Sequence, residues 1–195
     1  MQGKALSTFK FSDGTCIAQA QVGPRPAVTL ASPALTVMTD LTTVRAATVD
    51  PTESLAQAEA AMVQQGVRML FVVTQMPCVD GIVTLADLRG DKPMKLLQRR
   101  GGKREELCVA DVMSKLSDLD VLDLDALGRA TVADLAATLN RAGRPHLLVV
   151  EAASATGSGR IRGVVSHSQV ERQLGSPLPM VEIATTFAEV EQALA

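Results

Sequence analysis

The sequence predicts a mixed α/β fold built from two tandem copies of one β-α-β-β-α unit, packed pseudo-symmetrically. The first observation is a motif that occurs twice, as GIVTLAD at residues 81–87 and as GVVSHSQ at residues 163–169. Each copy has a glycine, two β-branched residues, a hydroxyl residue and, three positions later, a side chain with a terminal carbonyl oxygen. A repeated supersecondary unit constrains the fold before any single residue is interpreted.

The duplication continues upstream of this motif. Residues 66–73 align with residues 143–150, since both segments begin with glycine and end in an apolar run. A Val-Met pair at residues 37–38 corresponds to a second Val-Met pair at residues 112–113. The second copy is longer at residues 151–160, where mostly small side chains indicate a flexible hairpin loop. Insertions confined to loops are expected of a structural repeat.

In the first copy the hydrophobic period changes in a fixed order. Residues 43–49 have the pattern of a strand, and residues 54–65 place apolar side chains on one helix face. Ser54 and Gln57 form a capping box at the start of this helix, and Gly66 ends it. Two apolar strands follow, at residues 69–74 and at residues 79–84, and a second helix begins at about Leu85.

The second copy repeats the same order of elements. Thr131 and Asp134 provide the helix cap, and Gly143 provides the stop. We therefore expect an N-terminal extension, two repeats and a C-terminal extension, at residues 1–33, 34–100, 101–175 and 176–195. Within the extensions, a short hairpin is expected near residues 9–17 and an amphipathic helix near residues 187–194.

Composition narrows the class of protein. A chain of 195 residues can bury a sizeable core, as one compact domain or as two small halves. The net charge of −2 gives no general attraction to nucleic acid or to an anionic membrane. We expect a cytoplasmic protein, because no apolar run is long enough for a membrane span or a signal peptide. Cys16, Cys78 and Cys108 are widely spaced and odd in number, which favours reduced thiols.

The order of elements, the Val-Met pairs and the two glycine motifs resemble a tandem pair of CBS domains, the Bateman module, over about residues 34–175. The family usually has proline where Phe71 and Leu148 stand, and both replacements suit a buried strand. The resemblance implies a regulatory module that requires no further cofactor. It binds an adenosine compound in clefts between the repeats: AMP, ADP or ATP, with S-adenosylmethionine or NAD possible.

Carried over onto this sequence, the resemblance assigns Asp87 to the ribose hydroxyls and Thr84 to the phosphate side of the ligand. The chemistry is reasonable, because a carboxylate accepts hydrogen bonds from two vicinal hydroxyls and a helix N-terminus favours an anion. The remaining ligand residues that the resemblance implies are Arg68 towards phosphate, Ile82 of the motif, and Pro145 and His146 of the other copy towards the base.

The same motifs also have a purely structural interpretation. Thr84-x-x-Asp87 and Ser166-x-x-Gln169 both fit capping boxes. Gln169 is neutral and accepts less well from a ribose diol, so the second copy is expected to keep the cap and to hold a degenerate site. A ligand-free interaction or dimerisation module with a vestigial cleft therefore stays open as the alternative function.

Other candidate residues favour a non-catalytic protein. No nucleophile–base pair is visible, and His146 and His167 lack partners at metal-ligand spacing, so neither an enzyme nor a metal site is expected. Basic residues at 99–104 are not interleaved with aromatic residues, which favours a solvated linker over a nucleic-acid contact. Apolar helix faces in both repeats favour a homodimer, and a sensor of this kind needs a regulated protein on another chain.

Overall fold

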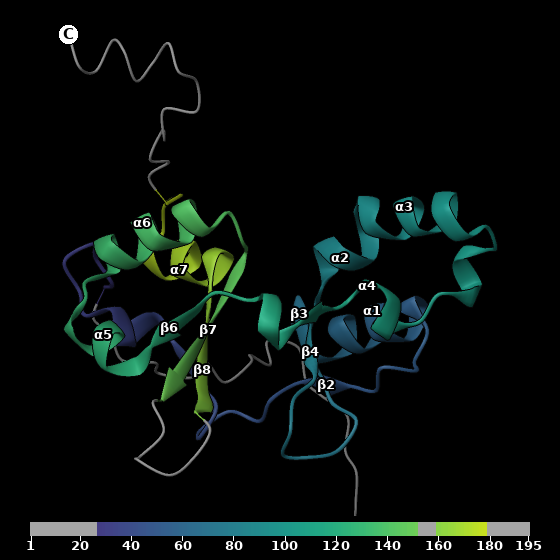
Figure 1. Cartoon of the computed structure of the whole chain (residues 1–195). Coiled ribbons are helices and arrows are strands. Elements are labelled where there is room, and N and C mark those ends of the chain that lie inside the picture. Colours follow the sequence, from purple (N-terminus) through teal and green to yellow (C-terminus); the bar gives the residue numbers. More distant parts are fainter. Residues whose placement is uncertain (1–26, 152–158, 179–195) are drawn as a thin grey trace, which may run out of the picture.

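A computed structural model describes residues 27–151 and 159–178 (Figure 1). Two small mixed sheets covered by helices confirm the predicted mixed α/β class. The hairpin expected near residues 9–17 and the helix expected near residues 187–194 lie outside the described residues, as does most of the loop at 151–160.

The first sheet has the strand order β2-β3-β4-β5. β2 (Thr48–Val49) is parallel to β3 (Met69–Val72), which pairs antiparallel with β4 (Gly81–Thr84). α1 (Leu55–Gln65) connects β2 to β3, and α2 (Leu85–Arg89) follows β4. The predicted order of elements in the first copy is therefore confirmed.

The second sheet has the order β1-β8-β7-β6. β6 (Val121–Asp123) is parallel to β7 (His146–Glu151), which pairs antiparallel with β8 (Arg160–Ser166). α6 (Val132–Ala142) connects β6 to β7, and α7 (His167–Leu174) follows β8. The β-α-β-β-α unit thus occurs twice, as the sequence predicts.

Each half is completed by the leading element of the other copy. The 3₁₀ helix η1 (Ala34–Val37) packs into the second core, and β1 (Thr39–Asp40) pairs with β8. In exchange, α4 (Val109–Val112) packs into the first core, and β5 (Ser114–Lys115) pairs with β4. The two Val-Met pairs of the sequence therefore mark the points where the repeats interlock.

Two helices differ between the repeats within the described residues. α3 (Asp91–Arg100) follows α2 in the first copy and is followed by the 3₁₀ helix η2 (Arg104–Glu106), whereas the described part of the second copy ends at residue 178. α5 (Leu124–Arg129) occurs only in the second, after the 3₁₀ helix η3 (Leu116–Asp118). The basic residues at 99–104 are exposed, as expected of a solvated segment between the copies, and they lie at the end of α3, in the turn after it and at the start of η2.

The predicted helix caps are present where the local sequence specifies them. Ser54 and Gln57 close a capping box at α1, and Thr131 and Asp134 close one at α6. Gly66 and Gly143 end these helices in the left-handed region, which glycine adopts without a Cβ penalty.

The strand expected over residues 43–49 is shorter than predicted. Only β2 forms, because Asp40 organises the preceding residues into a turn. Its backbone carbonyl oxygen accepts from Val44 N at 2.9 Å, and its side chain accepts from Thr42 N at 2.8 Å. This turn carries the chain from β1 of one sheet to β2 of the other, which a continuous strand could not do.

The two sheets meet through a cluster of buried apolar side chains. The cluster joins both copies and consists of Met69, Phe71, Ile82, Leu148 and Val164. Phe71 and Leu148 are both buried there, as expected. This contact fixes the position of one repeat relative to the other, and therefore the shape of the space between them.

Candidate functional site

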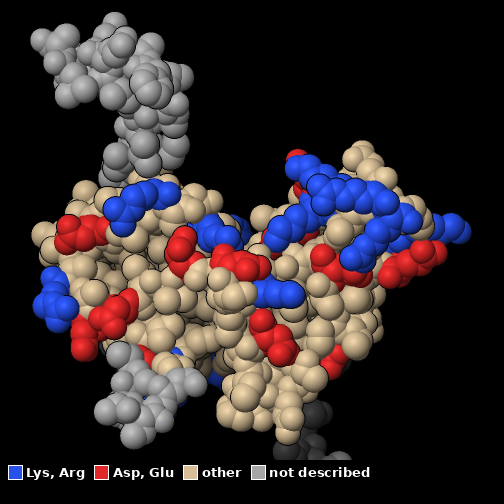
Figure 2. Space-filling model, in the orientation of Figure 1, with Lys and Arg blue, Asp and Glu red and all other residues tan. Residues whose placement is uncertain are grey.

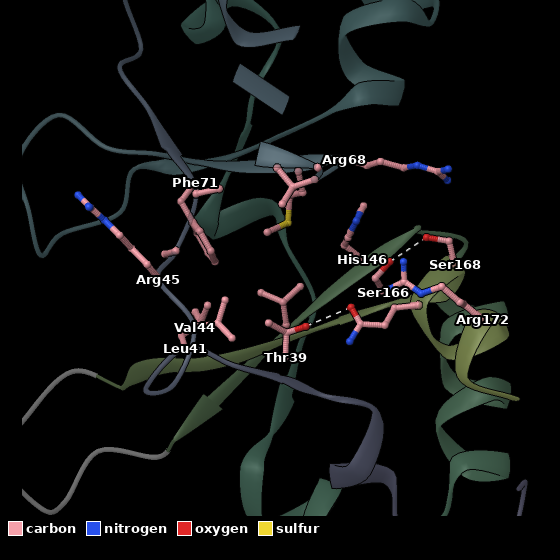
Figure 3. Close-up of a pocket in the computed structure, with 17 residues that line it drawn as sticks. Thr39, Leu41, Val44, Arg45, Arg68, Phe71, His146, Ser166, Ser168 and Arg172 are labelled. Atoms are coloured by element: carbon pink, nitrogen blue, oxygen red, sulfur yellow. Dashed lines mark hydrogen bonds between the residues drawn. The ribbon is translucent and has the colours of Figure 1, made fainter. Parts of the chain in front are cut away.

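A cleft of about 380 Å³ lies between the two repeats (Figure 3). The first copy contributes the segment before β2, residues 44–47, and the turn before β3, residues 66–69. The second copy contributes the start of β7 and the β8–α7 junction. Both repeats are required to form its walls, and its volume lies in the range of small-molecule sites.

The β8–α7 junction is not capped as the sequence predicted. Ser166 makes no side-chain cap hydrogen bond and lies 3.2 Å, oxygen to oxygen, from the Ser168 hydroxyl. Gln169 instead accepts a 3.2 Å hydrogen bond from Thr39 of the exchanged strand β1 (Figure 3). The capping box predicted at Ser166 and Gln169 is therefore wrong, and both side chains line the cleft.

The start of α7 favours a negative charge. His167 N donates to the Pro145 carbonyl oxygen at 2.9 Å, but Ser166 supplies no side-chain acceptor, so the N–H groups that follow in the first turn keep their partial positive charge. Arg172 of the same helix also lines the cleft, and Figure 3 shows it close to Ser166. The N-terminal end of α7 and the Arg172 guanidinium together form a surface that suits a phosphate or carboxylate group.

The charged side chains that line the cleft are basic. Arg45, Arg68 and Arg172 line it, and no Asp or Glu of the described residues does so. In Figure 3, Arg45 and Arg68 lie on opposite sides, with their guanidinium groups directed outward from the rim. Long arginine side chains at a rim can reach a bound anion without blocking the cavity.

His146 stands at the start of β7, between Arg68 and the β8–α7 junction (Figure 3). Burial lowers the pKa of His146 to about 4, helped by the Arg68 guanidinium and opposed by the Asp87 carboxylate. Its Nδ1 atom is buried and has no hydrogen-bond partner within the described chain. At neutral pH the cleft therefore has a neutral imidazole, which can donate or accept one hydrogen bond.

The first glycine motif is used differently from the second. The Thr84 hydroxyl and backbone N–H donate to Asp87 Oδ2 at 2.6 and 2.9 Å, and Asp87 N donates back to the hydroxyl at 3.2 Å. This is the capping box that the sequence predicted. The other carboxylate oxygen, Oδ1, forms an ion pair with Lys92 of α3.

The structure divides the residues predicted for the ligand site. Arg68 and His146 line the described cleft, together with Ser166 and Gln169, which were expected to form a degenerate site. The residues that do not line this cleft are Thr84, Asp87, Ile82 and Pro145. Ile82 is buried between the sheets, whereas Pro145 is exposed in the turn before β7.

Sequence reasoning missed Thr39, Arg45 and Arg172. Arg172 could have been found, because it lies one helical turn beyond Ser168 on α7 and shares its side of the helix. Thr39 and Arg45 carried no such signal, since they reach the cleft only through the exchange of β1 and the turn that follows it.

The described residues have neither a metal-ligand cluster nor a membrane-spanning helix. Across residues 27–151 and 159–178, no three His, Cys, Asp or Glu side chains are grouped so that they could hold a metal ion. In the same part of the chain, no helix has the length and apolar character needed to cross a membrane.

Comparison with known proteins supports the assignment of the fold. Residues 37–91 match the family model of the CBS domain. No curated protein sequence matches the chain. The crystal structure of CBSX2 from Arabidopsis thaliana in complex with AMP has a TM-score of 0.51 and 23% identity, over 72% of this chain and 94% of that one. An uncharacterized conserved protein from Pyrococcus horikoshii has a TM-score of 0.54 and 17% identity, over 79% of this chain and 100% of that one.

Proposed function

We propose that this chain, a tandem CBS-domain protein, is a regulatory module that binds an adenosine-containing ligand of the AMP, ADP or ATP class between its repeats. The observation that carries the proposal is the 380 Å³ cleft, whose charged lining residues are all arginines. Arginine holds phosphate through two parallel hydrogen bonds, which suits a phosphorylated ligand. The CBSX2 structure, solved with AMP, has the same fold and supports the proposal.

In this proposal the phosphate lies at the start of α7, where Arg172 and the helix N-terminus favour an anion. Gln169 and Thr39 offer amide and hydroxyl groups to the ribose, and Phe71 offers an apolar wall to the base. The assignment of the other motif's residues, Thr84, Asp87, Ile82 and Pro145, to a ligand stays a prediction.

The charge of the cleft ranks the candidate ligands. Phosphorylated nucleosides and NAD present negative groups to the three arginines, whereas adenosine presents none. S-adenosylmethionine has a positive sulfonium centre, which the same arginines disfavour. We therefore expect affinity to rise from adenosine to AMP and ADP.

A sensor of this kind acts through another chain. We propose a regulatory role rather than an enzymatic one, with a homodimer as the oligomeric state and a separate protein as the regulated partner. Light scattering at micromolar concentration is expected to give twice the chain mass. A monomer over a wide range of dilution would contradict the dimer.

The aromatic composition gives a direct test of ligand binding. The chain has no Trp, no Tyr and four Phe, so the protein contributes little absorbance at 280 nm and adenine carried through purification dominates near 260 nm. We expect a 260 nm signal released by heat or acid. A hundredfold excess of AMP or ADP over Kd should stabilise the fold by about 2.7 kcal/mol in thermal unfolding.

Arg172→Gln sharpens the test. Loss of a charge-assisted hydrogen bond to phosphate should weaken ADP binding about tenfold to a hundredfold, measured by calorimetry. Arg141→Gln is the matched control, because Arg141 lies on α6 of the same repeat and does not line the cleft. Absence of both the 260 nm signal and any thermal shift with nucleotides, S-adenosylmethionine or NAD would leave the ligand-free interaction module.

A further inference from the structure

The two repeats place equivalent residues beside their two glycine motifs. Thr39 and Ser114 each follow a Val-Met pair, and Gln169 and Asp87 each stand three residues after a hydroxyl residue. On the second side, Thr39 bonds directly to Gln169. On the first side, a lysine from elsewhere in the chain lies between the corresponding two residues.

That lysine is Lys92, near the start of α3. Its ammonium group forms an ion pair with Asp87 Oδ1 and donates to the Ser114 hydroxyl and to the Val112 carbonyl oxygen, both at 3.2 Å. An ammonium group has three hydrogens to donate, and each has an acceptor here. The Lys92 side chain therefore satisfies the polar groups beside Asp87 from within the chain.

Both oxygens of the carboxylate that would receive a ribose already have donors. Thr84 donates two hydrogen bonds to Asp87 Oδ2, and Lys92 forms an ion pair with Oδ1. The Asp87 side chain is only 14% exposed. A diol that displaced the ammonium would leave a charge without its partner at a partly desolvated position, which is unfavourable.

Lys92 is held in place by α3. Figure 2 shows the Lys and Arg side chains gathered over α3, and Leu96 and Leu97 of this helix pack on the first core. Arg100 at its end forms a 2.7 Å ion pair with Asp111 of α4. The helix is thus anchored along its length, and Lys92 is positioned before any ligand arrives.

We propose that Lys92 is a built-in cation that occupies the position beside Asp87, the counterpart of the Gln169 side of the described cleft, so that each chain binds one ligand, on the Gln169 side. The number of ligands per chain rests on the proposed function, whereas the engagement of Asp87 by Lys92 is a property of the free protein. Two measurements test these two claims separately.

The first measurement uses the free protein. Asp87→Asn should lower the melting temperature by about 2–4 °C, corresponding to a loss of ~1 kcal/mol in a chain of this size. In a Lys92→Met background the same change should have little effect, because the ion pair is already lost. Lys95→Met is the matched control: Lys95 pairs with exposed Asp91 on the same helix, and its effect should add to that of Asp87→Asn. Additive effects of Lys92→Met and Asp87→Asn would overturn the engagement of Asp87 by Lys92.

The second measurement counts bound ADP by calorimetry. The wild-type protein should bind one ADP per chain, and Lys92→Met should bind two. The added site should disappear in the Lys92→Met, Asp87→Asn double variant. Two sites in the wild type, or a single site in Lys92→Met, would overturn the proposal. If neither protein binds ADP, the proposed function fails and the unfolding measurement alone decides the role of Lys92.

Discussion

The two glycine motifs begin with the same geometry and end with different uses. In the first copy, Thr84 and Asp87 close a capping box and Lys92 neutralises the carboxylate. In the second, the Ser166 side chain does not cap α7, and Gln169 accepts a hydrogen bond from Thr39. The copy with the charged residue is satisfied internally, and the copy with the neutral residue lines an open cleft.

The difference teaches that charge determines how such a motif is used. A carboxylate accepts strong hydrogen bonds from a backbone N–H, a hydroxyl and an ammonium together, so the fold itself can saturate it. An amide oxygen is a weaker acceptor and the amide also has an N–H donor, so Gln169 forms a hydrogen bond with a neighbouring hydroxyl instead. The residue that the resemblance ranks best for ribose is therefore the one that the chain engages most completely.

The largest expected effect concerns the glycines that begin the motifs, where the exchanged strands lie against them. A Cβ at Gly81 would meet the Ser114 carbonyl oxygen well inside van der Waals contact. At Gly163 it would meet the flexible Met38 side chain at 2.5 Å and the Thr39 carbonyl oxygen at 2.9 Å. We expect Gly81→Ala to cost about 3 kcal/mol in urea unfolding and Gly163→Ala about 1–2 kcal/mol. Equal costs would show that both strand exchanges adapt equally well.

The next effect is a loss of stability in acid, caused by His146. Its pKa is about 4 in the folded protein and 6.5 when unperturbed, so the unfolded chain binds more protons between these values. Stability should therefore be full above pH 6.5 and fall as the pH decreases towards 4. We expect a loss of about 2 kcal/mol after allowing for the partial exposure of the ring.

Urea unfolding between pH 7 and pH 4 measures this loss. His146→Leu should remove it, whereas His167→Gln should keep it, because His146 is unchanged in that variant. The capping carboxyls titrate separately: hydrogen bonds from backbone N–H groups hold the pKa values of Asp111 and Asp134 below 3.8, so their contributions are lost at lower pH. A fall of the same size in the His146→Leu variant would contradict the assignment.

The sequence was sufficient where the interactions are local. The boxes at Ser54 and Thr131, the helix stops at Gly66 and Gly143 and the order of elements all depend on residues within a few positions of each other. These predictions are confirmed. The repeat supplied the rest of the fold, because a unit that occurs twice has to pack its two apolar faces together.

The site could not be predicted in the same way, because it depends on contacts between distant parts of the chain. Thr39 reaches Gln169 across 130 positions, and only the strand exchange brings them together. Lys92 reaches Ser114 across 22 positions, from α3. Motif chemistry alone therefore favoured the Asp87 side, whereas the described cleft lies on the Gln169 side.

The smallest expected effect tests the comparison at the hydroxyl residues themselves. Thr84→Ala removes a side chain that accepts from Asp87 N at 3.2 Å and donates to its carboxylate, so α2 loses its cap. The cost should be about 1 kcal/mol in urea unfolding. Ser166→Ala removes a hydroxyl that caps no helix, so we expect a change within about 0.5 kcal/mol. ADP affinity should respond in the opposite order, with a measurable loss only in Ser166→Ala, which lines the cleft. A loss of stability in Ser166→Ala equal to that in Thr84→Ala would mean that the second motif is a cap after all, and that the two copies do not differ as the structure indicates.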